Sequence, residues 1–300
     1  MKFKDLLFKK NNGVTRDYHF GNYVLTLGKH HILDKYQKEF PLYDRFVPLL
    51  CAEFKGLIID VGANIGDTSI AIFSQNDTAF VVGVEPDKSF FDECIHNIKR
   101  NALTERFLGV NRFVSTQSGN FVVKKSDSLS TGSIAKSEDT GAGNNTISFA
   151  ELMEMIPAVK KEKFDILKID TDGFDWDILS SFSQYAKDNT LLPEFIFFEM
   201  QTFLNNNEKS NEGRDAIIDK YFVALKEMYQ LGYTNFCLFD NFGTLVKKTH
   251  SIEDIYEFNQ YIKRSQIINH HSTIYYLDVL AYKTPSEAYV DKVLSQMYSK

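Results

Sequence analysis

The chain has 300 residues, of which 43% are apolar and 25% charged, and these proportions exclude a disordered protein. Its 34 Lys and Arg residues against 40 Asp and Glu residues give a net charge of -6, which argues against sequence-independent binding to nucleic acid. Three widely spaced cysteines predict neither a disulfide framework nor a zinc site. No apolar run is long enough to span a membrane, and we expect a cytoplasmic protein.

Residues 1–55 are predicted to form an N-terminal extension with short strands and a helix. A strand-like run occurs at Tyr23–Leu27, and Lys35–Cys51 then carries apolar residues at helical spacing. No internal repeat occurs, and no Pro- or Gly-rich linker separates two domains. Residues 56–300 are therefore expected to form one catalytic domain with insertions.

Strands and helices alternate directly after this extension. The runs GLIIDVG (56–62) and AFVVGVEPD (79–87) are short and apolar, which is typical of strands that are buried on both faces of a parallel sheet. A helix is predicted after each strand, over 68–74 and 89–101. Alternation of this kind implies right-handed crossovers and an α/β fold.

The rest of the chain continues this pattern with polar interruptions. Further strands are predicted at 112–115, 120–124, 164–170, 194–200, 235–240 and 273–284. Further helices are predicted from Ser148 to Val159 and over 176–185, 216–231 and 251–269. The polar stretches 126–146 and 205–214 are predicted to be exposed insertions. The two last strands have no helix tightly between them, so we expect them to pair antiparallel near one edge of the sheet.

The turn after the first buried strand is the first candidate for chemistry. The segment 60–68 (DVGANIGDT) joins the carboxyl end of that strand to a helix, and open parallel sheets bind ligands at this end. Gly62 and Gly66 carry no side chain where a ligand would approach the backbone, and Asp60 can order the turn or face a positive charge. An ordinary strand-to-helix turn with a capping residue explains the same two glycines.

Glu85 strengthens the ligand-binding interpretation. It ends the next strand about 25 residues after Asp60, where an acid can accept both hydroxyls of a ribose. An exposed acid before a turn proline is the alternative. The third glycine of a pyrophosphate-binding G-x-G-x-x-G is missing, which argues against a nicotinamide-dependent oxidoreductase. A nucleoside with a cationic centre that Asp60 and Asp67 tolerate, such as S-adenosylmethionine, fits better.

Four segments together resemble the FkbM-type S-adenosylmethionine-dependent methyltransferase family: IIDVGANIGDTS, GVEPD, DILKIDTDGFDWDIL and FIFFEM. The resemblance covers roughly residues 56–200. It implies a class I methyltransferase (Rossmann-like) fold, with a seven-stranded, mostly parallel sheet, helices on both faces and an antiparallel last strand. It also implies a cofactor site with Glu85 at the ribose and Ser115 near the adenine. The implied contacts to the methionine part are Asp60, Gly62, Asn64, Gly66 and Asp67.

Three acids on the later strands are candidate catalytic residues. Asp170 and Asp172 follow a strand end that would face the sulfonium, where an acid can position a hydroxyl or take its proton. The family pattern has Glu where this chain has Asp172, so Asp170 is the stronger candidate for the base. Glu199 interrupts an apolar strand and is expected to orient the acceptor, with a structural salt bridge as the alternative. We expect Lys168 to pair with one of these carboxylates, and we predict no metal site.

These observations predict an O-methyltransferase that uses S-adenosylmethionine and acts on a hydroxyl of a sugar, saccharide or related small molecule. The expected setting is bacterial surface-polysaccharide or natural-product biosynthesis, with no nucleic acid as partner. A catalytically silent, methyltransferase-like binding domain is the alternative. The shorter acid at Asp172 favours that alternative, whereas the retained Asp60, Gly62, Gly66 and Glu85 argue against it.

Overall fold

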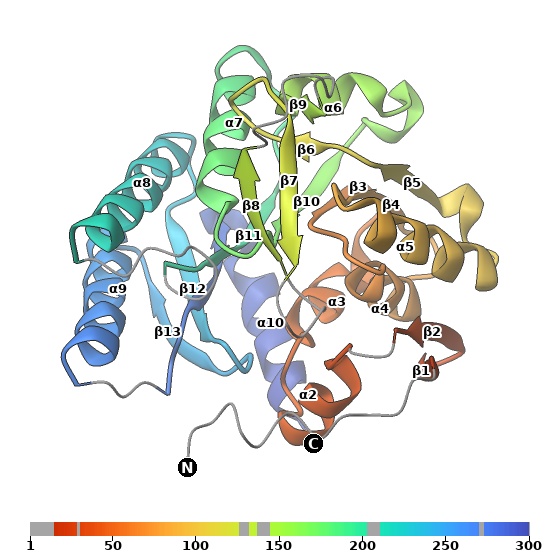
Figure 1. Cartoon of the computed structure of the whole chain (residues 1–300), viewed down its shortest axis with the longest axis horizontal. Coiled ribbons are helices and arrows are strands. Elements are labelled where there is room, and N and C mark those ends of the chain that lie inside the picture. Colours follow the sequence, from red (N-terminus) through yellow and green to blue (C-terminus); the bar gives the residue numbers. More distant parts are fainter. Residues whose placement is uncertain are drawn as a thin grey trace.

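The computed structural model describes residues 15–28, 31–125, 132–136, 145–202, 211–269 and 273–299. The predicted insertions 126–146 and 205–214 therefore lie largely outside the described residues. Within the described ranges, an eight-stranded sheet forms the middle layer, with helices on both faces (Figure 1). The α/β fold predicted from the sequence is thus confirmed.

The sheet has the strand order β13-β12-β14-β11-β10-β3-β4-β5. Its strands are β3 (Leu57–Val61), β4 (Phe80–Val84), β5 (Phe107–Val110), β10 (Phe164–Ile169), β11 (Phe195–Met200), β12 (Asn235–Asp240), β13 (Leu245–Thr249) and β14 (Leu277–Tyr282). From β5 to β11 the strands are parallel, whereas β14 runs antiparallel to both β11 and β12. Seven strands therefore form the expected arrangement with an antiparallel last strand, and β13 adds an eighth at the edge.

Two hydrophobic cores, one on each face of the sheet, explain why the central strands are apolar throughout. All five residues of β3 and all six of β10 are buried. One face is covered by α6 (Phe149–Met155), α7 (Asp175–Asp188), α8 (Asn211–Gln230) and α9 (Ile252–Ile267). The other face is covered by α3 (Phe46–Leu50), α4 (Asp67–Gln75), α5 (Lys88–Arg100) and α10 (Glu287–Tyr298). The carboxyl ends of the parallel strands lie between these two layers of helices.

The N-terminal elements share the second of these cores. β1 (Arg16–Phe20) and β2 (Tyr23–Leu27) form a hairpin, and the Thr26 backbone N–H donates to Asn97 Oδ1 of α5 at 2.8 Å. The Phe46 ring of α3 packs on Phe239 of β12, with ring centroids 4.6 Å apart. The described part of residues 1–55 is thus packed onto the sheet, and the boundary expected at residue 55 stays a prediction.

Some elements differ from the sequence prediction. A single helix over Lys35–Cys51 is wrong, because α2 (Leu33–Glu39) and α3 are separated by a turn that contains Pro41 and the left-handed Asp44. The helix capped by Ser148 ends at Met155 rather than Val159, since a residue that precedes proline disfavours helical backbone angles and Ile156 precedes Pro157. Strands β5 and β13 and helix α10 were not predicted.

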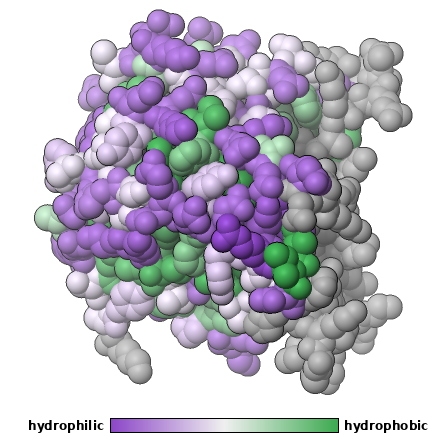
Figure 2. Space-filling model, turned by 90° about the vertical axis from the view of Figure 1, so that its left-hand side faces the viewer, coloured by the Kyte–Doolittle hydropathy of each residue, from purple (hydrophilic) through white to green (hydrophobic). Residues whose placement is uncertain are grey.

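The outer surface on the side of α8 and α9 is mainly hydrophilic, with smaller apolar groups between the polar side chains (Figure 2). Among the helices that the structure describes, none is both long enough and apolar enough to cross a membrane.

Candidate functional site

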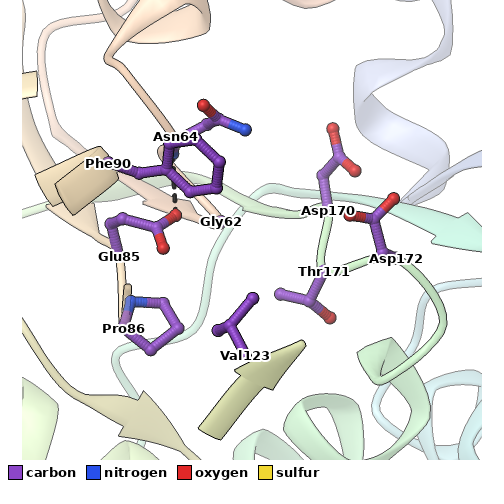
Figure 3. Close-up of a pocket in the computed structure, with 9 residues that line it drawn as sticks. All are labelled: Gly62, Asn64, Glu85, Pro86, Phe90, Val123, Asp170, Thr171 and Asp172. Carbon is purple, nitrogen blue, oxygen red and sulfur yellow. Dashed lines mark hydrogen bonds between the residues drawn. The ribbon is translucent and has the colours of Figure 1, made fainter. Parts of the chain in front are cut away.

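An open hollow of about 420 Å³ lies at the carboxyl ends of β3, β4 and β10. Figure 3 shows Glu85, Pro86 and Phe90 on one side of the hollow and Asp170 and its neighbours on the other. The lining residues are Gly62, Asn64, Glu85, Pro86, Phe90, Val123, Asp170, Thr171 and Asp172. Five of the ten predicted site residues therefore meet here: Gly62, Asn64, Glu85, Asp170 and Asp172.

Gly62 forms the floor of this hollow at the end of β3. Its φ angle of +81° is in the left-handed region, and a Cβ atom there would lie only 1.7 Å from the Asp170 carbonyl oxygen. The Gly62 N–H donates to the Val84 carbonyl oxygen of β4 at 2.9 Å. Any larger residue would push the ends of β3 and β10 apart, so this position requires glycine.

Glu85 is held on the wall by the backbone of two loops. Its Oε2 accepts from the Asn64 N–H at 2.9 Å, and its Oε1 accepts from the Asp87 N–H at 2.8 Å. Asn111, which the sequence analysis missed, donates from Nδ2 to the backbone carbonyls of Glu85 and Pro86. Burial raises the pKa of Glu85 to about 7, against the effect of the two N–H donors. Each carboxylate oxygen keeps a lone pair for a further donor.

Asp60 lies beneath the hollow and does not line it. It is fully buried, with Lys168 Nζ 3.0 Å from its Oδ1 and the Ser69 hydroxyl donating to its Oδ2 at 2.8 Å. Lys168 Nζ is also 3.4 Å from Asp170 Oδ2, so the expected pairing of this lysine with a site carboxylate is confirmed. Burial lowers the pKa of Lys168, but Asp60 and Asp170 outweigh it and raise the pKa above its usual value. Asp60 is thus linked to the hollow through Lys168.

Gly66, Asp67 and Ser115 do not line the hollow, and their predicted contacts with the cofactor stay predictions. Gly66 precedes α4 and packs against Cys94 of α5. Asp67 lines a separate small recess beside the N-terminal elements. Ser115 is buried, and its Oγ accepts from the Gln117 N–H at 2.9 Å, which explains it as part of a turn. None of the three belongs to the lining.

The three candidate catalytic acids differ in exposure. The Asp170 side chain is 48% exposed, and Asp172 sits in the left-handed region with φ 54°. Glu199 is only 5% exposed, and Gln201 Nε2 donates to its Oε2 at 3.0 Å. Burial raises the pKa of Glu199 well above its usual value, and the charges of Asp170 and Asp172 raise it further. Burial thus makes Glu199 easier to protonate than an exposed glutamate.

Asp175 connects the two strand ends that carry these acids, and the sequence analysis did not find it. Its Oδ2 accepts from the Thr171 backbone N–H at 3.2 Å and from the Thr171 hydroxyl at 2.8 Å, and its Oδ1 accepts from the Glu199 N–H at 3.2 Å. Burial, followed by the charge of Asp170, raises its pKa to about 7. An acid in the first turn of a helix is common, so its position alone gave no signal of this role.

No group of three or more His, Cys, Asp or Glu side chains in the described part of the chain is arranged to hold a metal ion.

Comparison with known proteins gives the family. The family model described as Methyltransferase FkbM domain matches residues 60–234, which is more than half of the chain and includes every lining residue of the hollow. No curated protein gives a match.

Several solved methyltransferase structures are similar to this chain only at low identity. A putative caffeoyl-CoA O-methyltransferase from Staphylococcus aureus is 12% identical, with a TM-score of 0.43, over 85% of this chain and 93% of that one. An O-methyltransferase from Bacillus cereus in complex with SAH is 13% identical, with a TM-score of 0.41, over 84% and 89%. These similarities are too distant to carry an argument. On the family match, the chain belongs to the FkbM methyltransferase domain family.

Proposed function

We propose that this member of the FkbM methyltransferase domain family methylates a hydroxyl of a sugar, saccharide or related small molecule. Methyl transfer from S-adenosylmethionine follows from the family. The hydroxyl acceptor, its saccharide nature and a cytoplasmic role in bacterial surface-polysaccharide or natural-product biosynthesis are our proposal. The observation that carries it is that one hollow has Glu85 on one wall and Asp170 on the other.

The residues of the hollow fit this cofactor. Gly62 leaves the backbone bare, and the Glu85 carboxylate has acceptor capacity for the two hydroxyls of a ribose. Asp170 offers a negative charge opposite Glu85, which suits a sulfonium. We assign Gly62, Asn64 and Glu85 to cofactor binding, with Asp60 in support through Lys168. When bound, S-adenosylmethionine supplies an electrophilic methyl group on positively charged sulfur.

The acids of this chain then orient the acceptor and take its proton. The Asp170 carboxylate is half-exposed, and its ion pair with Lys168 fixes its position. A sugar hydroxyl has a pKa far above neutral, so its proton is not removed before the methyl group arrives. Asp170 accepts this proton late in the transfer, when formation of the new O–C bond has made the hydroxyl proton acidic. In its protonated form, which burial favours, the Glu199 carboxyl can donate a hydrogen bond to an acceptor oxygen. Asp172 lies next to Asp170 on the same rim and is the second candidate for the base.

Incubation with labelled cofactor and a panel of nucleotide-linked sugars and oligosaccharides tests this function. We expect transfer to at least one of these acceptors. We also expect Asp170→Asn to reduce turnover while cofactor affinity stays within a few-fold of wild type. Asp77→Asn, which changes an exposed acid in the loop before β4, is the matched control. A fully active Asp170→Asn variant would remove Asp170 from the mechanism, and no cofactor binding at millimolar concentration would favour the silent domain.

A further inference from the structure

Asp170 lies between the hollow and a second group of polar side chains at the same end of the sheet, where the parallel strands have their carboxyl ends. Strands β4, β3, β10, β11 and β14 are neighbours in that order. Their residues at this edge are Glu85, Gly62, Asp170, Glu199 and Asp278, respectively. A group beside Glu199 and Asp278 would therefore lie on the far side of Asp170 from Glu85.

Glu199 and Asp278 project from the same face of the sheet. They are direct partners in the antiparallel ladder of β11 and β14, and residues opposite each other in such a ladder share a face. Phe197 and Leu280, two positions further along, are partners on that face and belong to the core that contains Phe46 of α3. The two acids thus lie under the N-terminal elements, at the open end of this core.

The turn between α2 and α3 is fixed above these acids by the β12–β13 turn. The Phe40 ring stacks on the Phe242 ring, with centroids 4.0 Å apart. Gly243 allows close backbone contact, since a Cβ atom there would lie 2.4 Å from the Leu42 carbonyl oxygen. Tyr43 follows directly and is therefore held in place at the sheet edge.

Below this turn, polar side chains of the N-terminal elements and of the β14 segment are close enough to interact electrostatically. Tyr276, which immediately precedes β14, lies within electrostatic reach of Tyr43, Glu199 and Asp278. Asp278 in turn lies within reach of Asp170. Within the described residues, the hydroxyls of Tyr43 and Tyr276 and the Asp278 carboxylate have no hydrogen-bond partner, although all three side chains are partly buried. Such groups need water or a ligand as a partner.

We propose that Tyr43, Tyr276 and Asp278 form the acceptor subsite and bind a polyhydroxylated ring, such as a pyranoside, next to Asp170. This inference rests on the proposed function and names residues that determine its specificity. Tyrosine rings present flat apolar faces with a polar tip, which suits the C–H face and hydroxyls of a sugar. The Asp278 carboxyl group can exchange hydrogen bonds with sugar hydroxyls. The N-terminal elements are therefore part of the active site.

Saturation-transfer NMR with methyl gluco-, galacto-, manno- and rhamnopyranosides, in the presence of S-adenosylhomocysteine, tests the subsite. We expect the wild type to bind at least one glycoside, and Tyr43→Phe, Tyr276→Phe and Asp278→Asn each to weaken that binding about ten-fold. Tyr261→Phe and Asp77→Asn change exposed residues elsewhere and are expected to leave it unchanged. Calorimetry with S-adenosylhomocysteine, expected within a few-fold of wild type for every variant, shows that each variant is folded.

Glycoside binding that all three subsite variants leave unchanged would overturn the inference. Absence of any glycoside signal from the wild type with S-adenosylhomocysteine bound would overturn it as well, and would leave cofactor-dependent methyl transfer intact. Failure of the wild type to bind S-adenosylhomocysteine would instead contradict the proposed function, and the subsite with it.

Discussion

Replacement of Glu85 by glutamine tests the cofactor site, because this one side chain accepts hydrogen bonds from two loops and is proposed to bind the ribose as well. The two carboxylate oxygens accept from the N–H groups of Asn64 and Asp87. A glutamine keeps one acceptor oxygen but presents an NH₂ group to the other N–H, and it removes the negative charge. A hydrogen bond to a charged group contributes about 1.5–3 kcal/mol, so we expect the affinity for S-adenosylhomocysteine to fall by about 10- to 150-fold.

Titration calorimetry at pH 8, where the wild-type Glu85 carboxyl is ionised, measures this loss. Glu105→Gln, an exposed acid in the turn between α5 and β5, is the matched control and should bind like wild type. Wild-type affinity should also decline as pH falls through about 7, because protonation of Glu85 removes an acceptor, and the Glu85→Gln variant should lack this decline. Wild-type affinity in a folded Glu85→Gln protein would refute the assignment of the ribose to this residue.

Three further outcomes follow from the same edge of the sheet. Gly62→Ala should abolish cofactor binding or folding because of its 1.7 Å clash, whereas Gly21→Ala, with φ +56° and no atom within 4 Å, should cost only about 1 kcal/mol in chemical denaturation. Lys168→Met should lower the free energy of unfolding by about 3–5 kcal/mol, and pairing it with Asp60→Asn should recover part of this loss. The pKa values of Glu85 and Asp175 are raised in the folded state, so the folded state binds more protons than the unfolded state. The melting temperature of the ligand-free protein should therefore fall as the pH rises from about 5 to about 7.5, and a melting temperature that rises over this range would contradict this.

Much of the fold could be predicted because its strands are buried on both faces. The apolar runs around Asp60 and Lys168 are flanked by polar segments, and they coincide with the buried strands β3 and β10. Strand β13 escaped prediction because it is an edge strand with Lys247 and Lys248 on its exposed part, which removes the apolar signal. The break between α2 and α3 depends on how the turn packs against Phe242, a contact that is distant in sequence.

The candidate site could be predicted where a residue's role depends on its place at a strand end. Gly62, Glu85 and Asp170 meet in the hollow because parallel strands end at one edge. The role of Asp60 could not be predicted from its place at a strand end. It depends on a 3.0 Å ion pair with Lys168, which lies on a strand more than a hundred residues later in the chain. Asp278 was missed because its partner Glu199 lies on a strand much earlier in the chain, and only the antiparallel register of β11 and β14 places the two acids opposite each other.

A crystal structure of the protein with S-adenosylhomocysteine measures the central contact directly. We predict that the nucleoside occupies the hollow, with both ribose hydroxyls within hydrogen-bond distance of the Glu85 carboxylate and the sulfur facing Asp170. A ligand bound at another place, or a ribose held by other groups while Glu85 turns away, would contradict the assignment on which the proposed chemistry depends.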